Sequence, residues 1–204
     1  MCAKLGIVGE LHRAVRRNYP RRYVTIKGRG DLLQADIVEM RPYASENQDY
    51  NYLLTMIDTF SKRGWALPLK TKTGLEVAKA LEFVFKDLKH VNKLLQTDQG
   101  SQFFNKHVNR LLKHYDVRHY SSYSILKASI VERFNRTLKS WMWKEFSLRG
   151  SYEWVSLLDG LLKRYNNRLH RTIGVAPSQV NSHNERTILS RLIQKKLSPK
   201  KKNK

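Results

Sequence analysis

Residues 128–139 read Ala128-Ser-Ile-Val-Glu-Arg-Phe-Asn-Arg-Thr-Leu-Lys139, and the rest of the chain can be interpreted around them. Apolar side chains recur at the spacing of one helix face, at Val131, Phe134, Leu138 and Met142. The stretch therefore predicts an amphipathic helix. Its other face is predicted to carry Glu132, Asn135, Arg136 and Lys139. An acid and two cations on one face can hold a metal ion beside a phosphate backbone, although a plain surface helix with i, i+4 ion pairs has the same pattern.

Composition predicts a folded, strongly basic domain. The 204 residues are 41% hydrophobic, enough to bury one core and a small appendage. Ten tyrosines and four tryptophans indicate a folded domain and not a disordered basic chain. Lys and Arg number 39 against 17 acids, a net charge of +22. Such an excess indicates a polyanionic partner, with nucleic acid as the first candidate and an acidic membrane surface as the second.

Several classes of protein are disfavoured. No apolar run approaches the roughly 18 residues of a membrane-spanning helix, and no secretory signal pattern opens the chain. The single cysteine, Cys2, excludes a disulfide framework and any multi-cysteine zinc site. We expect a reducing intracellular compartment, no membrane partner and no small-molecule substrate.

The first half of the chain predicts a mixed sheet. Residues 32–40, 52–57 and 65–69 read as strands with short connections, typical of an antiparallel meander, and Pro68 favours an edge position for the third. A helix of about 15 residues should follow Thr73, with Glu76 placed as in a capping box. Residues 93–97 and 117–120 predict two further strands, separated by a helix over residues 105–115.

The second half is predicted to be helical. A polar and mobile connection, Ser121–Ser124, should lead into the helix of residues 128–139, and a further helix is expected over residues 151–169. Pro177 suits the first turn of a short helix, and a weak helix is expected around Ile188. We divide the chain into a basic arm or linker (1–30), a catalytic-type core (31–182), and a weak helix with a basic disordered tail (183–204).

Three acids stand where a metal site is plausible. Asp36 lies within a strand, Asp98 ends a short strand before a glycine turn, and Glu132 opens the amphipathic helix. A carboxylate inside a strand needs a compensating charge, which magnesium supplies through its preference for hard oxygen ligands. Structural roles remain open at this point: Asp36 as a sheet-edge residue or salt-bridge partner, and Asp98 as a turn residue. Asp58, which also follows an apolar strand, rivals Asp98.

Three blocks carry a resemblance to a known family. They are Leu33-Gln-Ala-Asp36, Thr97-Asp-Gln-Gly-Ser-Gln-Phe103 and Val131-Glu-Arg-Phe-Asn-Arg-Thr-Leu-Lys139. In this order they resemble the signature blocks of the retroviral-type integrase core, one of the DDE transposases and integrases, from about Asp31 to Val180. Within that family the chain most resembles integrases of Maverick/Polinton-type transposons and related transposon-derived animal proteins. The resemblance implies an α/β, RNase H-like fold: a five-stranded mixed sheet flanked by helices, here with basic N- and C-terminal extensions.

The resemblance also implies a chemistry. Asp36, Asp98 and Glu132 match the catalytic and metal-binding triad, which holds two Mg²⁺ ions, or Mn²⁺ as a substitute, when DNA is bound. The positions expected to contact DNA are Gln102, Lys127, Asn135, Arg136 and Lys139. The implied reaction is 3′-end processing by water and then strand transfer of transposon ends into target DNA. A homodimer or higher oligomer and a nuclear location are expected, although Lys200-Lys-Lys202 suits a solvated tail as well as an import signal.

Two departures keep other functions open. Leu33 stands where the family usually has Trp, and the His-His-Cys-Cys zinc module that commonly precedes the core cannot form with one cysteine. A domesticated, catalytically inactive DNA-binding or scaffold protein is therefore the first alternative, and an RNase H-like nuclease is the second.

Overall fold

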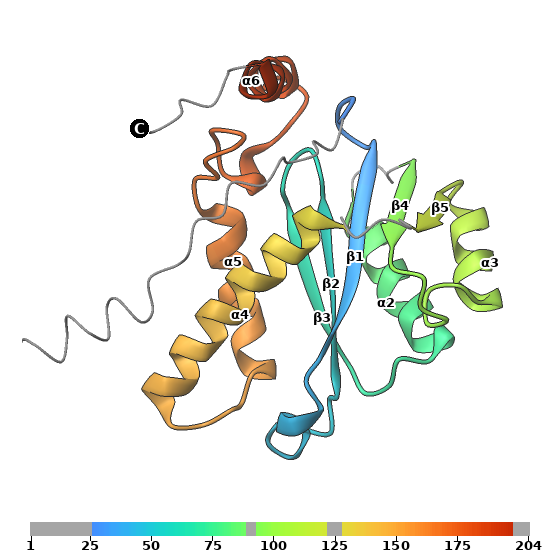
Figure 1. Cartoon of the computed structure of the whole chain (residues 1–204), viewed down its shortest axis with the longest axis vertical. Coiled ribbons are helices and arrows are strands. Elements are labelled where there is room, and N and C mark those ends of the chain that lie inside the picture. Colours follow the sequence, from blue (N-terminus) through green and yellow to red (C-terminus); the bar gives the residue numbers. More distant parts are fainter. Residues whose placement is uncertain (1–25, 89–92, 122–127, 198–204) are drawn as a thin grey trace, which may run out of the picture.

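A five-stranded sheet lies at the centre of the computed structural model, which describes residues 26–88, 93–121 and 128–197 (Figure 1). The strands follow the spatial order β3-β2-β1-β4-β5. Their bounds are Leu32–Glu39 (β1), Tyr52–Asp58 (β2), Gly64–Leu69 (β3), Leu94–Thr97 (β4) and Arg118–Ser121 (β5). All five lie where the sequence predicts strands.

The sheet is mixed, as predicted. Strands β1, β2 and β3 form an antiparallel meander, whereas β4 and β5 run parallel to β1. Pro68 lies in edge strand β3, where its missing N–H breaks no ladder. Strand β1 is central, and the acid that it carries, Asp36, pairs with Thr55 of β2, whereas the pairing of β1 with β4 ends at Gln34 and Gln96.

Helices cover both faces of the sheet (Figure 1). One core packs α2 (Gly74–Asp87) and α3 (Lys106–His114) against the sheet, and the other packs α4 (Ser129–Arg149) and α5 (Leu158–Asn167) on the opposite face. Side chains of successive strand residues point to opposite faces, which gives the sheet two apolar surfaces to bury. The three-layer α/β, RNase H-like architecture implied by the resemblance is confirmed.

Shorter elements complete the described chain. They are the 3₁₀ helices η1 (Arg41–Glu46), η2 (Val155–Leu157) and η3 (Pro177–Gln179), and the helix α6 (Glu185–Leu197). Pro177 opens η3, as predicted, and α6 spans the region of the weak helix. Ile188 of α6 packs with Phe60 and Ile173 in a small third core. In the described part of the chain, none of the helices combines the length and apolar character needed to cross a membrane.

Two local predictions were wrong. Thr73 precedes α2 without a side-chain cap, and Glu76 accepts hydrogen bonds from Lys70 N and Thr71 N at 2.7 and 2.8 Å, so no capping box forms. The helix predicted over residues 151–169 begins only at Leu158 and ends at Asn167. The Asn47 side chain accepts hydrogen bonds from the backbone N–H groups of residues 154 and 155, which holds this segment outside the helix.

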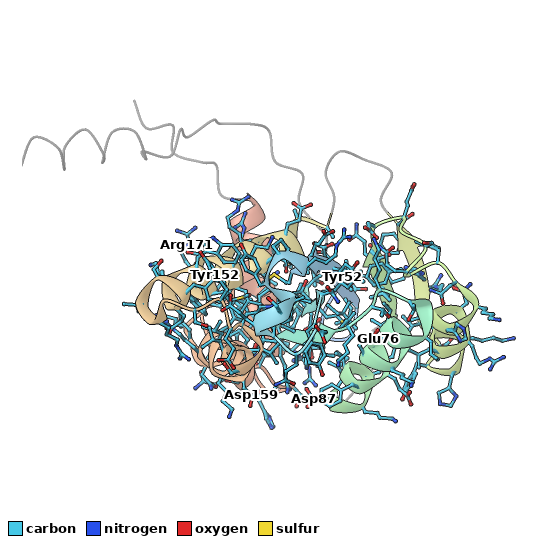
Figure 2. All side chains as sticks on the ribbon, turned by 90° about the horizontal axis from the view of Figure 1, so that it is seen from below. Tyr52, Glu76, Asp87, Tyr152, Asp159 and Arg171 are labelled. Carbon is cyan, nitrogen blue, oxygen red and sulfur yellow. The ribbon has the colours of Figure 1, made fainter. Side chains whose placement is uncertain are left out.

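The η1 segment lies at the same end of the molecule as the turn after α4. Figure 2 views the molecule from this end, with Tyr52 and Tyr152 labelled. Tyr152 stacks on Tyr43 with 5.0 Å between the ring centroids, which ties the β1–β2 connection to the α4–α5 connection. The division of the chain into arm, core and tail stays a prediction, because residues 1–25 and 198–204 lie outside the described residues.

Candidate active site between strand β1 and helix α4

Asp36 is the most constrained of the three predicted acids. It is half-buried in central strand β1, where Oδ1 accepts a hydrogen bond from Ile37 N at 2.9 Å and Oδ2 accepts one from Asn135 Nδ2 at 2.8 Å. Burial raises the pKa of Asp36, and the negative charges of Asp98 and Glu132 raise it further. Asp98, which follows β4, and Glu132 of α4 therefore both act electrostatically on Asp36.

Asp98 directly follows β4 and is exposed. Its Oδ1 accepts a hydrogen bond from Gly100 N at 3.1 Å and one from Gln102 Nε2 at 3.4 Å, so the carboxylate closes the turn that the sequence suggested. Gln102, predicted to contact DNA, lies beside Asp98 in this structure. A turn role and a metal role are compatible here, since Oδ2 accepts no hydrogen bond from the described residues.

Helix α4 carries the third acid in its first turn. Val131, Phe134, Leu138 and Met142 form the predicted stripe, and each is at most 1% exposed. Glu132, Arg136 and Lys139 are exposed on the other side and line a groove with Asp36. The stripe and the exposed acid and cations are therefore placed as the sequence predicted.

Asn135 is a correction to the predicted polar face. It is only 7% exposed, and its amide nitrogen donates to Asp36 Oδ2 instead of pointing into solvent. Asn135 lies at the border between the apolar stripe and the exposed face, one turn after Val131, where helical spacing alone does not decide burial. It holds the Asp36 carboxylate, and any contact with DNA would occur from within the groove that it lines. Lys127 lies outside the described residues.

The three acids lie close, but they are not gathered into a ligand cluster. Within residues 26–88, 93–121 and 128–197, no group of three Asp, Glu, His or Cys side chains is near enough to hold one metal ion. Asp36 and Glu132 share the groove, and Asp98 is not among the residues that line it. The donor set nevertheless suits a hard divalent cation, because all three groups are carboxylates. Burial, and then the charges of Asp98 and Glu132, disfavour the ionised form of Asp36, and a cation would offset both effects.

A buried glutamine, missed in the sequence, joins the elements that carry the acids. Gln34 is fully buried, and its Nε2 donates to Gln96 Oε1 of β4 at 2.9 Å. Its Oε1 accepts from Ile130 N and Val131 N, both at 3.1 Å, so it caps the first turn of α4. Gln34 and Gln96 each stand two residues before an acid, and Val131 directly precedes Glu132. One side chain thus fixes β1, β4 and α4 just ahead of the three carboxylates.

Asp58, the rival of Asp98, has a structural role. It is 6% exposed at the end of β2, and its carboxylate accepts hydrogen bonds from Ser61 N at 2.9 Å and from the Ser61 hydroxyl. It therefore shapes the β2–β3 turn. Lys62 in the same turn is buried and donates to the Thr59 carbonyl. Desolvation lowers the pKa of Lys62 to about 8 against the opposing effect of Asp58.

A second missed feature supports the backbone at Asp98. The Thr97 hydroxyl donates to the Asp98 carbonyl at 2.7 Å, and His119 Nε2 lies 2.8 Å from the same hydroxyl oxygen. Since that hydroxyl proton is already used, His119 acts as the donor through Nε2. The His119 ring stacks on Phe104 at 4.2 Å, and burial lowers its pKa, which favours the neutral ring.

A family model and several relatives match this chain. Residues 27–123 match the family model described as "Integrase core domain". An uncharacterised transposon-derived protein of Caenorhabditis elegans is 37% identical over 141 residues, 69% of this chain and 49% of that protein. The Gag-Pol polyprotein of woolly monkey sarcoma virus is 32% identical over 155 residues, 74% of this chain and 9% of that polyprotein. The chain thus spans about half the length of the first relative and a small part of the second.

Solved structures show the same fold. The intasome of simian T-cell lymphotropic virus aligns with a TM-score of 0.69 and 21% identity, over 80% of this chain and 59% of that chain. The HTLV-2 integrase catalytic core domain in complex with magnesium aligns with a TM-score of 0.61 and 19% identity, over 74% of this chain and 95% of that chain. The family model and the relatives show that the chain carries an integrase core domain of the retroviral type, and the solved structures show the same fold.

Proposed function

We propose that this chain is an integrase-type polynucleotidyl transferase that trims the 3′ ends of transposon DNA and joins them to target DNA. The observation that carries the proposal is the placement of Asp36 and Glu132 in one groove, with Arg136 and Lys139 beside them. Burial raises the pKa of Asp36, and the charges of Asp98 and Glu132 raise it further. The family match and the magnesium complex of a solved relative support the same reaction class. Residues 128–139 thus contribute an acid at the site and cations beside it.

The three carboxylates would hold the metal. Asp36, Asp98 and Glu132 offer hard oxygen donors, and a divalent cation would relieve the repulsion that raises the pKa of Asp36. Two bound Mg²⁺ ions, or Mn²⁺ in their place, would activate the attacking oxygen and stabilise the leaving oxygen of an in-line displacement. The protein itself contributes the orientation of Asp36 through Asn135 and the anchoring of all three elements through Gln34.

The DNA would lie along the exposed face of α4. Arg136 and Lys139 line the groove beside the acids, where their charges can contact phosphate groups of the reacting strand. The net charge of +22 supplies further affinity that should fall steeply with salt. We propose Gln102, Lys127 and Asn135 as further contacts, and a nuclear, homo-oligomeric protein as the working form; solved relatives include dimeric and trimeric core structures.

Two observations favour a second function. In the described residues the three acids are not gathered closely enough to hold an ion, and the Caenorhabditis elegans relative is a transposon-derived protein. A domesticated protein that binds DNA without joining it would retain the fold and the cations and would not need a competent triad. Metal-dependent chemistry on DNA ends separates the two functions.

The deciding experiment incubates the full chain with paired DNA ends and either Mg²⁺ or Mn²⁺, and separates joined, nicked and unreacted strands. The proposal expects joined strands, and it expects Glu132→Gln to abolish joining while DNA binding persists, because only a metal-ligand charge is lost. Glu145→Gln, on the same helix and in an ion pair with Arg149, is the matched control and should join normally. Binding without reaction by the unaltered chain supports the scaffold function, and joining by Glu132→Gln would refute the triad.

A further inference from the structure

The groove that begins at the acids continues along α4 beyond the residues assigned above. It has a volume of about 1210 Å³ and lies between β1 and the exposed face of α4. Past Lys139 its lining consists of Ser140, Trp143, Lys144, Ser147 and Leu148. These residues continue the helical stripe that starts at Glu132, since they recur at spacings of three and four. The part of the groove beyond Lys139 is therefore continuous with the candidate active site.

Trp143 is the unusual residue of this surface. It is 44% exposed, whereas Trp65, Trp141 and Trp154 are at most 8% exposed. Its ring is held by neighbouring aromatic residues: it meets Tyr43 edge to face with centroids 5.8 Å apart, and Phe146 at 5.2 Å. A large ring that is fixed in place yet open to solvent is what stacking requires, because little conformational entropy is lost when a flat ligand binds.

The positive charge in the groove indicates that a flat ligand bound there would be anionic. Arg136, Lys139 and Lys144 line it, and none of them takes part in the ion pairs found among the described residues. Of the two acids on the β1 wall, Asp36 belongs to the candidate metal site, and Glu39 is paired with Arg41 at 2.7 Å. Unpaired cations beside an exposed aromatic ring are the features of a single-stranded nucleic acid site. The chain's own arm, residues 1–30, is itself basic and would be repelled from these cations.

We propose that Trp143 stacks an unpaired DNA base, with Lys144 and Lys139 at the adjacent phosphates. Trp143 lies eleven positions after Glu132, about 16 Å along the helix axis at 1.5 Å per residue. This length corresponds to about five nucleotides at the 3.4 Å spacing of one strand. The groove thus takes a DNA end whose strands are separated near the reacting position. This inference rests on the proposed function and adds the form of DNA end that the site accepts.

The test uses three DNA probes and the fluorescence of the full chain. The probes are a blunt duplex, the same duplex with a single-stranded extension, and that duplex with an abasic extension. Trp143 is the most exposed of the four tryptophans, so stacking should quench the fluorescence chiefly with the second probe. A Trp143→Leu variant should bind this probe roughly 5- to 150-fold more weakly, the range for one stacked base, and should bind the other two probes as the unaltered chain does.

Two variants separate stacking from loss of folding. Trp143→Phe keeps a flat ring and should retain most of the affinity for the extended duplex while losing the quenching. Phe83→Leu removes a ring that is 59% exposed on α2, on the other face of the sheet, and should change neither affinity nor quenching. The thermal midpoint of each variant checks that its fold persists.

The outcomes also distinguish this inference from the proposed function. If Trp143→Leu binds the extended and abasic duplexes with unchanged relative affinity, no base stacks on Trp143 and the inference fails, even if DNA joining persists. If Trp143→Leu weakens binding to all three probes equally, Trp143 supports the fold or contacts the duplex backbone, and the inference also fails. Absence of binding to every probe by the unaltered chain would overturn the proposed function together with this one.

Discussion

Replacement of Gln34 by leucine should destabilise the packing of β1, β4 and α4, the elements that position the three acids. The side chain is fully buried and makes three hydrogen bonds, to Gln96 on β4 and to the backbone N–H groups of Ile130 and Val131 at the start of α4. Leucine has a similar size and fits the apolar surroundings, but it can neither donate nor accept. The substitution therefore keeps Gln96 and the backbone of Ile130 and Val131 and removes only the hydrogen bonds that Gln34 makes with them.

The expected cost follows from the partners left behind. An unsatisfied buried donor or acceptor costs about 1–3 kcal/mol. Gln96 is 9% exposed and Val131 is fully buried, so both bear this cost, whereas half-buried Ile130 can be reached by water. We expect Gln34→Leu to lower the free energy of unfolding by about 2–6 kcal/mol. For a chain of this size the thermal midpoint should fall by about 4–24 °C.

Urea unfolding at constant pH and salt measures this cost. Gln99→Leu is the matched control, because Gln99 is exposed just after Asp98, and its replacement should change stability by less than about 0.5 kcal/mol. In a cycle with Gln96→Leu, the double variant should be more stable than the sum of the single losses predicts, since leucine at both positions leaves no unsatisfied amide between the strands. A loss below about 1 kcal/mol for Gln34→Leu, or strict additivity in the cycle, would refute the joining role.

Three further predictions concern other parts of the fold. Burial lowers the pKa of Lys62 to about 8 from 10.5, so between these two pH values the unfolded chain binds more protons than the folded chain. The free energy of unfolding should therefore rise by about 3 kcal/mol from pH 8 to pH 10.5. Unfolding measured at several pH values should show that Lys62→Met removes this rise. Gly64→Ala should cost about 1–3 kcal/mol in urea unfolding, because the added Cβ would lie 2.7 Å from the Phe134 ring. Arg136→Glu should weaken DNA binding and flatten its salt dependence by about one phosphate contact or more in titrations at several salt concentrations.

The strands and helices could be predicted because burial imposes a period on the sequence. In α4 the residues at i, i+3 and i+4 spacing are the buried ones, and the core that they form faces β1 and β2. The same reasoning found the acids, since a carboxylate inside or at the end of an apolar strand is conspicuous. The fold and the neighbourhood of the site thus follow from local patterns.

The parts that could not be predicted depend on partners distant in sequence. Gln34 looks like an ordinary strand residue until Gln96 and the start of α4, 62 and 97 positions away, are seen around it. Asn135 lies on the border of its helix stripe, and only Asp36, 99 positions away, accounts for its burial. The late start of α5 depends on Asn47 in the same way, at a separation of 107 positions. The periodicity of a single segment does not indicate which distant residues will contact it.

The positions of these unpredicted contacts bear on how the three acids would bind a metal ion. Gln34 fixes the strands and the helix just ahead of Asp36, Asp98 and Glu132, but two of the three carboxylates remain exposed beyond the fixed points. Asp36 is held by Asn135 and by its own strand, and Asp98 accepts hydrogen bonds within its turn from Gly100 N and Gln102 Nε2. A cation bound at Asp36 would relieve the repulsion from Asp98 and Glu132 that adds to the effect of burial on the pKa of Asp36. The described residues thus fix the elements that carry the acids and leave the Asp98 and Glu132 carboxylates exposed, which accords with the absence of a gathered ligand cluster among these residues.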